Sequence, residues 1–174
     1  NITGEKFSGK THLINIFLHK NKGIKFEGKS LVNDDLKRIK IYENIVIENF
    51  SSDVDEKLLY SLFNLIEQDN KFIIVTSVKP IVNITFELRD LKSRAKNFIL
   101  LNIEKPDDDL IFAIILKNLS DRQISLDDKF IEFIVKRIER SYSKIYDFIY
   151  KIDQLSLKKK KSIDFKIIKE VLGE

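Results

Sequence analysis

The residues with the clearest chemical potential lie at the start of the chain, in the segment GEKFSGKT at Gly4–Thr11. This segment fits the pattern G-x-x-x-x-G-K-[ST], which forms a loop around the phosphates of a nucleotide. Gly4 and Gly9 let the backbone turn so that successive N–H groups point inward at phosphate oxygens. Lys10 would reach the β- and γ-phosphates, and the Thr11 hydroxyl would hold Mg²⁺. The pattern therefore predicts a phosphate-binding loop.

Chance is a poor explanation for this match, because the chain of 174 residues contains only five glycines. The alternative interpretation is a flexible basic turn before an ordinary helix. A helix that begins near Lys10 would add the positive end of its dipole to the anion site. We also count Ser8, within the loop, and His12, directly after Thr11, among the nucleotide-binding candidates. His12 and His19 have no Cys or third His to form a metal site with them.

Two polar residues, Glu48 and Asn49, follow the apolar run Ile45–Ile47, which is typical of a buried parallel strand. A phosphate-loop enzyme needs an acid here to organise Mg²⁺, and usually a second acid to activate water. Glu48 can serve the metal, although it is one methylene longer than the usual Asp. Asn49 can orient water but cannot accept its proton, so we expect weak hydrolysis or none. The alternative interpretation is a strand followed by a polar turn.

Thr76 and Ser77 end the next apolar run, which begins at Phe72. A polar residue at this position can contact the γ-phosphate or the attacking water. Strands also often end in Thr or Ser before a turn, so this signal is weak alone.

A basic segment containing Arg94 precedes Phe98. An Arg in this region could reach a nucleotide across a subunit interface, in the role called an arginine finger. The alternative interpretation is a solvated basic face of a helix.

Strands alternate with helices in the first part of the chain, which predicts a parallel α/β sheet. The expected strands cover residues 24–26, 45–49, 72–76 and 98–103, and the expected helices cover residues 12–20, 31–37, 53–66 and 90–93. Only three residues precede the loop, so we expect the strand that normally leads into it to lie upstream of Asn1.

The strands stop after Pro106, and helical patterns follow at residues 107–119, 126–138, 141–155 and 164–172. We therefore expect an α/β nucleotide-binding domain at residues 1–105 and an all-helical subdomain at residues 106–174.

The composition fits an ordinary folded domain, with 43% hydrophobic residues, 33% charged residues and a net charge of +4. The charge allows contact with nucleic acid but does not argue for it. Cysteine is absent, which excludes disulfides and thiolate metal sites and fits a cytoplasmic location. We find no signal peptide and no apolar run of the ~20 residues that span a bilayer. Met is also absent, so we expect the sequence to be part of a longer product.

These motifs together resemble the AAA+ module of bacterial replication initiators, the DnaA/Hda family, from Gly4 to Leu172. The resemblance rests on Gly-Lys-Thr-His-Leu after the loop, a strand ending in acid-Asn, a strand ending in Thr-Ser, Leu91-Lys92-Ser93-Arg94, and the entry Pro106-Asp107-Asp108 to the helices. It implies a P-loop core with a five-stranded parallel sheet, a helical lid, and ADP or ATP with Mg²⁺ as the ligand.

The resemblance looks closest to the Hda branch, which switches the initiator off. Asn49 resembles the acid-Asn pair of that branch, and no helix-turn-helix domain follows Leu172. The branch implies DnaA–ATP as the partner, the DNA-loaded sliding clamp as the platform, and no sequence-specific DNA binding. A homodimer is also compatible with it. Arg94 matches the family's arginine finger, which would promote hydrolysis of ATP held by DnaA. The clamp-binding peptide of the branch lies upstream of the loop and is not in this sequence.

The sequence departs from the family at two positions. Val78 stands where the family's strand-end motif has an Asp, and Ser143 stands where the lid arginine that contacts nucleotide is expected. We take Lys144, beside Ser143, as the replacement candidate, and Arg140 lies one turn earlier. Three other functions stay open: the AAA+ part of an initiator or helicase loader, a free-standing ATPase, and an interaction scaffold with a vestigial loop.

Overall fold

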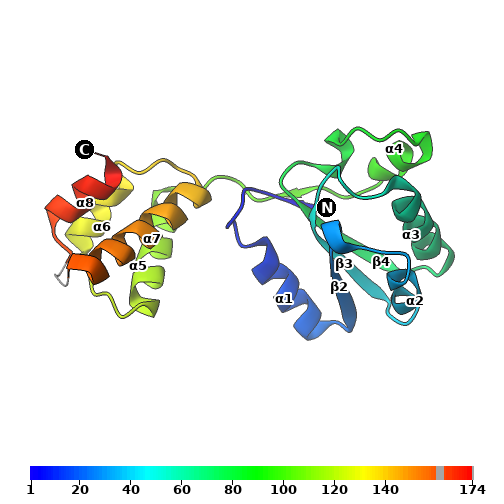
Figure 1. Ribbon diagram of the computed structural model, residues 1–174, viewed down its shortest axis with the longest axis horizontal. Coiled ribbons are helices and arrows are strands. Elements are labelled where there is room, and N and C mark those ends of the chain that lie inside the picture. Colours follow the sequence, from blue (N-terminus) through cyan, green and yellow to red (C-terminus); the bar gives the residue numbers. More distant parts are fainter. Residues whose placement is uncertain (160–162, 174) are drawn as a thin grey trace. The chain divides into compact units, whose positions relative to one another are not determined.

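Five parallel strands form one sheet in the computed structural model of the protein, which describes residues 1–159 and 163–173. The strand order is β2-β3-β4-β1-β5 (Figure 1). The strands are β1 (Ile2–Thr3), β2 (Gly23–Glu27), β3 (Asn44–Phe50), β4 (Phe72–Ser77) and β5 (Leu101–Asn102). The helices among them are α1 (Lys10–Lys20), α2 (Asp35–Ile39), α3 (Glu56–Gln68) and α4 (Arg89–Ala95), with short 3-10 turns at Gly28–Ser30 and Ile81–Asn83. The predicted P-loop α/β architecture is confirmed.

The strand before the loop lies within the given sequence, whereas we expected it upstream of Asn1. Ile2 and Thr3 themselves form β1, which lies between β4 and β5. Ile2 pairs with Thr76 on one side and with Leu101 on the other. Two residues suffice because a parallel neighbour on each side supplies partners for their backbone groups.

The expected strand at residues 98–103 shrinks to the two residues of β5. Among the strands, β5 pairs only with β1, and β1 is itself two residues long. Ile99 and Leu100 precede the paired stretch and are exposed. An edge strand extends only as far as its one neighbour, so the apolar pattern alone overestimated its length.

The two faces of the sheet carry different helices. Figure 1 shows α1 on one face, with α2, α3 and α4 on the other. Ile45 and Ile47 of β3 point into the main apolar core, together with Leu59 and Leu62 of α3. Residues alternate in direction along a strand, so Val46 and Glu48 point to the face that α1 covers. The pattern thus places the end of β3 on the same face as the loop and its helix.

A second compact unit begins at Glu104 and contains only helices among its described residues. These are α5 (Asp108–Asp121), α6 (Asp128–Val135), α7 (Tyr142–Lys159) and α8 (Phe165–Leu172). Their apolar stripes meet in a core of their own, which includes Ile111, Ile131, Ile149 and Ile168. None of the described helices is long and apolar enough to cross a membrane.

Aspartate side chains begin several of the helices. Asp107, Asp127 and Asp164 each accept a hydrogen bond from a backbone N–H in the first turn of α5, α6 and α8. Such caps satisfy N–H groups that have no partner inside the helix. In α3 the cap is Asp55, and the helix begins at Glu56, three residues later than the expected start at residue 53.

We expect Ile149→Ala to lower the free energy of unfolding by about 2–5 kcal/mol, because it removes buried methyl groups and leaves a cavity. Ile149 is 1% exposed in the core of the second unit. The matched control is Leu157→Ala in the same helix, since Leu157 is 67% exposed. Urea unfolding followed by circular dichroism measures both, and equal effects would contradict the assigned core.

Candidate nucleotide-binding site

The loop at Gly4–Thr11 leaves strand β1 and runs directly into α1. The N–H of Gly4 donates to the carbonyl of Ser77 in β4, 3.3 Å away, which fixes where the loop begins. A Cβ on Gly4 would lie 2.8 Å from Ser8 Oγ, so no side chain fits there without a shift. Gly9 has φ of 89°, a left-handed conformation that favours glycine. Gly4 is required because neighbouring atoms leave no room for a side chain, and Gly9 is required because of its backbone conformation.

Phe7 adds a feature that the sequence pattern did not reveal. Its φ is 66°, which is rare for a bulky residue, and its side chain is 56% exposed. The pattern leaves this position unrestricted, so it gave no signal. The loop therefore holds a left-handed turn without a glycine at one of its bends.

Lys10 lies across the inside of the loop. Its Nζ donates to the carbonyl oxygens of Gly4 at 2.7 Å and Glu5 at 2.6 Å, and it lies 3.4 Å from Ser8 Oγ. Burial lowers the pKa of Lys10, and the nearby Glu5 carboxylate opposes that shift. The ammonium is thus held inside the loop by carbonyl groups, which a bound phosphate would replace with stronger charge-assisted contacts.

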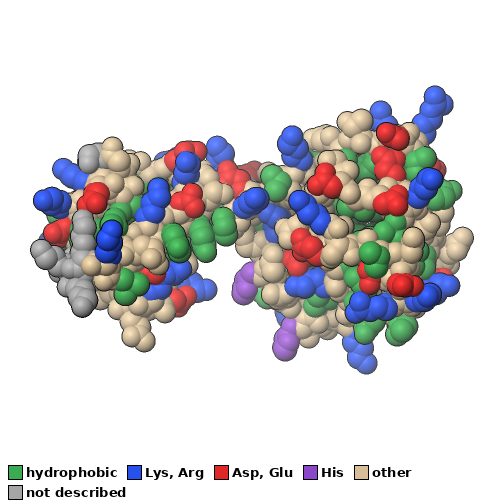
Figure 2. Space-filling model, viewed as in Figure 1, with side chains coloured by type: hydrophobic (Ala, Val, Ile, Leu, Met, Phe, Trp, Pro, Cys, Tyr) green, Lys and Arg blue, Asp and Glu red, His purple; other side chains and the backbone are tan. Residues whose placement is uncertain are grey.

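The first turn of α1 lacks a side-chain cap. Gly9 is the N-cap residue, and no side chain accepts a hydrogen bond from the N–H groups that follow it. A helix start with such N–H groups is an anion-binding site when a loop of this kind precedes it. The side chains of Thr11 and His12 are exposed beside it, and Figure 2 shows both histidines of the chain at the surface. The loop and the helix start together suit a polyphosphate.

Glu48 is buried at the end of β3, with only 5% exposure. Its Oε2 lies 2.8 Å from Nζ of Lys25 in β2, and among the described residues Oε1 has no hydrogen-bond partner. Lys25 also donates to Asn15 Oδ1 of α1 at 3.3 Å. Sequence reasoning missed Lys25, although alternation along β2 places it on the same face as Glu27, which pairs with Glu48.

Asn49 adopts a left-handed conformation with φ of 52° where the pairing of β3 with β4 becomes irregular. Its N–H donates to Thr76 Oγ1 at 3.1 Å, and its Nδ2 donates to Glu27 Oε2 at 3.2 Å. Thr76 is 1% exposed. The hydroxyl of Thr76 therefore holds the end of β3 in place, and the Asn49 amide is turned toward Glu27. Contact of either side chain with nucleotide or water stays a prediction.

The predicted Mg²⁺ ligands, Thr11 and Glu48, make a poor set. Mg²⁺ prefers charged and neutral oxygen ligands in an octahedral arrangement. The Thr11 hydroxyl is exposed, but the carboxylate of Glu48 is already neutralised by Lys25. No group of three or more His, Cys, Asp or Glu suited to a metal exists among the described residues. The side chains present fit the phosphates of a nucleotide, and they do not fit Mg²⁺ in the usual manner.

Arg94, in α4, is held by side chains of its own chain. Its Nη2 donates to Asn64 Oδ1 at 2.7 Å, its Nε donates to Asp90 Oδ2 at 2.9 Å, and its Nη1 lies 2.7 Å from Glu67 Oε2. These acidic partners raise the pKa of Arg94 further above its usual value. The side chain is 18% exposed. A solvated basic face does not describe this residue, whose guanidinium links α4 to α3.

Comparison with known proteins finds relatives of this chain. Residues 107–172 match the family model described as "Hda, lid domain". Over 189 residues, covering 95% of this chain, the sequence is 22% identical to the chromosomal replication initiator protein DnaA of Caldanaerobacter subterraneus subsp. tengcongensis. Together these matches support membership of the DnaA/Hda family of AAA+ proteins.

Two further relatives show how much of each protein the similarity covers. The DnaA of Lachnoclostridium phytofermentans is 28% identical over 66% of this chain. The chain spans only 25% of that initiator and 43% of the Caldanaerobacter one. An uncharacterised protein of Haemophilus influenzae is 21% identical over 99% of this chain, which spans 80% of it.

Several solved structures have the same fold. Domain III of Thermotoga maritima DnaA superposes with a TM-score of 0.77 at 19% identity, over 99% of this chain and 82% of that one. Thermotoga maritima RuvB, as its A156S mutant, gives 0.76 at 19% identity, over 99% of this chain and 60% of that one. A DnaA bound to AMPPCP and single-stranded DNA gives 0.66 at 19% identity, over 91% and 57%.

Lys144, the lid candidate for nucleotide contact, lies in α7 of the Hda-type lid. Arg140 precedes that helix and forms an ion pair of 2.9 Å with Asp108 of α5. Arg140 thus has a role within the lid, whereas contact of Lys144 with nucleotide stays a prediction.

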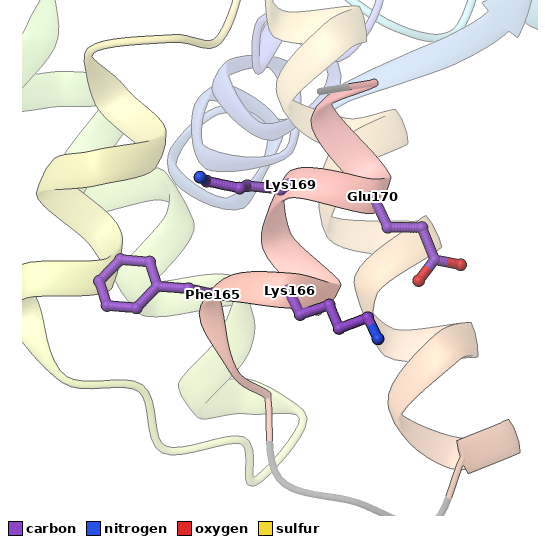
Figure 3. Close-up of a pocket in the computed structure, with 4 residues that line it drawn as sticks. All are labelled: Phe165, Lys166, Lys169 and Glu170. Atoms are coloured by element: carbon purple, nitrogen blue, oxygen red, sulfur yellow. The ribbon is translucent and has the colours of Figure 1, made fainter.

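A shallow hollow on the lid does not add a second site. It is lined by Phe165, Lys166, Lys169 and Glu170 of α8. Figure 3 shows Lys166 and Glu170 pointing to one side of the helix, and Phe165 and Lys169 to the other. Phe165 packs on the ring of Phe130, 4.4 Å between centroids. The four side chains do not converge on one ligand.

We expect Thr76→Val to speed hydrogen exchange of the Asn49 amide by about fivefold, because that N–H loses an acceptor worth about 1 kcal/mol. Thr76→Ser keeps the hydroxyl and should leave the exchange close to the original rate. Exchange followed by NMR tests this, and an unchanged rate in Thr76→Val would contradict the assigned hydrogen bond.

Proposed function

We propose that the protein is a nucleotide-binding regulator of replication initiation that acts in the manner of Hda. It holds ADP or ATP in the loop at Gly4–Thr11 and promotes hydrolysis of the ATP bound to DnaA. The match of residues 107–172 to the Hda lid domain carries this proposal. The complete phosphate loop supports it, because Lys10 and the uncapped start of α1 provide the two kinds of phosphate contact.

The residues near the end of β3 favour binding over turnover. Asn49 has no basic group to take a proton from water, and its amide is bound to Glu27. Glu48, the acid beside it, is neutralised by Lys25. The site is therefore suited to hold a nucleotide for long periods, as a regulator does.

Arg94 would act on the nucleotide of DnaA. An arginine finger stabilises the charge that develops on the transferred phosphoryl group. Arg94 must exchange its contacts with Asn64 and Glu67 for that phosphate. Glu67 is 61% exposed, so its ion pair with Arg94 is at the surface and is weak enough to be exchanged. The DNA-loaded sliding clamp, a homodimer and a cytoplasmic location belong to the same proposal.

A second candidate is the AAA+ part of a DnaA-type initiator or helicase loader that assembles on DNA. The DnaA relatives favour it, because the chain spans only part of their length, 43% of one and 25% of another. Nucleotide-dependent assembly on DNA, measured by sedimentation with ATP and with ADP, would distinguish it from the regulator.

We expect Lys10→Ala to weaken ADP binding by about 10- to 100-fold, because it removes charge-assisted hydrogen bonds worth about 1.5–3 kcal/mol. Isothermal titration calorimetry measures the Kd. The matched control is Lys6→Ala, an exposed lysine of the same loop, which should retain the affinity. Equal losses in both variants would indicate a general charge effect and contradict the loop assignment.

We expect Arg94→Ala to remove the stimulation of DnaA's ATPase, a loss of about 10³-fold for a true finger, while ADP binding stays intact. Arg89→Ala, at the start of the same helix, is the control. Phosphate release from DnaA–ATP measures stimulation.

The contacts of Arg94 with α3 require a second readout. Asn64→Ala disturbs the link between α3 and α4 but keeps the guanidinium. If stimulation is lost to the same degree in Asn64→Ala and Arg94→Ala, Arg94 acts by supporting the fold and the finger assignment is wrong.

A further inference from the structure

The pair Lys25–Glu48 joins an ammonium group to the acid that the sequence predicts as a ligand of Mg²⁺. The two side chains come from adjacent strands, and their charged atoms are 2.8 Å apart. Glu48 is buried, whereas Lys25 is 37% exposed along its side chain. The carboxylate therefore depends on Lys25 for charge balance more than Lys25 depends on it.

One hydrogen bond of the ammonium group and the backbone pairing of its strand place Lys25 beside Glu48. Lys25 donates to Asn15 of α1, the helix that begins at the phosphate loop. Its own strand is paired with β3 over five residues, from Gly23 beside Asn44 to Glu27 beside Glu48. A lysine on such a strand cannot move away without losing a buried carboxylate as its partner.

The ion pair with Lys25 leaves the second carboxylate oxygen of Glu48 without a hydrogen bond among the described residues. This oxygen, Oε1, is buried. An unpaired buried oxygen of this kind is unfavourable unless a ligand satisfies it. A water held between this oxygen and a nucleotide phosphate would satisfy it with no change in charge, whereas Mg²⁺ would have to compete with Lys25 for the same carboxylate.

We infer that Lys25 is a built-in counter-ion for Glu48, which makes adenine nucleotide binding at this loop nearly independent of Mg²⁺. The inference rests on the proposed nucleotide binding. In a usual site the metal offsets the negative charge of the acid and of the phosphates together. Here the ammonium offsets the acid beforehand, so the acid neither repels the phosphates nor recruits the metal.

The test is calorimetric titration of ADP into the protein, in Mg²⁺ and in EDTA. For the unmodified chain we expect Kd values within about threefold of each other, because the site charge is already balanced. Lys25→Met leaves Glu48 as an unpaired buried carboxylate beside the phosphates. It should bind about tenfold more weakly in EDTA and recover most of that loss in Mg²⁺.

Two controls sharpen the result. Lys29→Met removes a lysine whose ion pair with Asp53 is 3.8 Å long and exposed, so it should leave the Mg²⁺ dependence unchanged. The double variant Lys25→Met/Glu48→Gln removes both charges and should again bind equally in Mg²⁺ and EDTA. If Lys25→Met does not fold, Lys25→Gln keeps a hydrogen-bond donor for Glu48 and replaces it.

The outcomes separate this inference from the proposed function. Tight binding of ADP by the unmodified chain in Mg²⁺ but not in EDTA would overturn the inference alone. The same small Mg²⁺ dependence in Lys25→Met and in the unmodified chain would overturn it too. Absence of ADP and ATP binding in both buffers would overturn the proposed function, and this inference with it.

Discussion

The parallel pairing of β1 with its two neighbours is the constraint on which the site depends. Two residues, Ile2 and Thr3, set the position of Gly4, whose N–H is then bonded to Ser77 of β4. Because neighbouring strands are parallel, the carboxyl ends of β1, β3 and β4 lie along the same edge. Ligands of open α/β sheets bind at this edge. The loop, Glu48 and Thr76 meet there although they are far apart in the sequence.

The contacts of two lysines, Lys10 and Lys25, have different consequences for ligand binding. The ammonium of Lys10 is held by the backbone carbonyl oxygens of Gly4 and Glu5. A phosphate can replace carbonyl groups with a gain in free energy, because it brings the charge that they lack. Lys25 is already paired with a full negative charge, so a ligand gains little by displacing it. The contacts of Lys10 favour phosphate binding, and the contact of Lys25 keeps Glu48 from binding a metal.

The phosphate loop, the strands β2–β4 and the lid helices could be predicted because local patterns specify them. Gly9 before Lys10 marks the loop, and Asp107 and Asp164 mark helix starts by their capping chemistry. Lys25 could not be found in this way. Alternation gives the face on which it lies, but only the register between β2 and β3 gives its partner.

Three other features depended on three-dimensional context. The hydroxyl of Thr76 holds the backbone of Asn49, 27 residues away in the sequence. Two of the acceptors of Arg94, Asn64 and Glu67, come from α3, and the length of β5 depends on β1. A pattern along one segment predicts which groups are available, whereas the partner that satisfies each group is set by the packing of several segments.

The departures from a usual ATPase site are consistent with one another. Asn49 has no group that can act as a general base. Glu48 is paired with Lys25, and the guanidinium of Arg94 links α4 to α3. Each change alone would only weaken hydrolysis. Under the proposed function, together they would leave Lys10 and the start of α1 available to phosphate while removing the means of cleavage. The proposed regulatory role is consistent with this combination, because such a protein would bind a nucleotide without cleaving it and would act on the nucleotide of a partner.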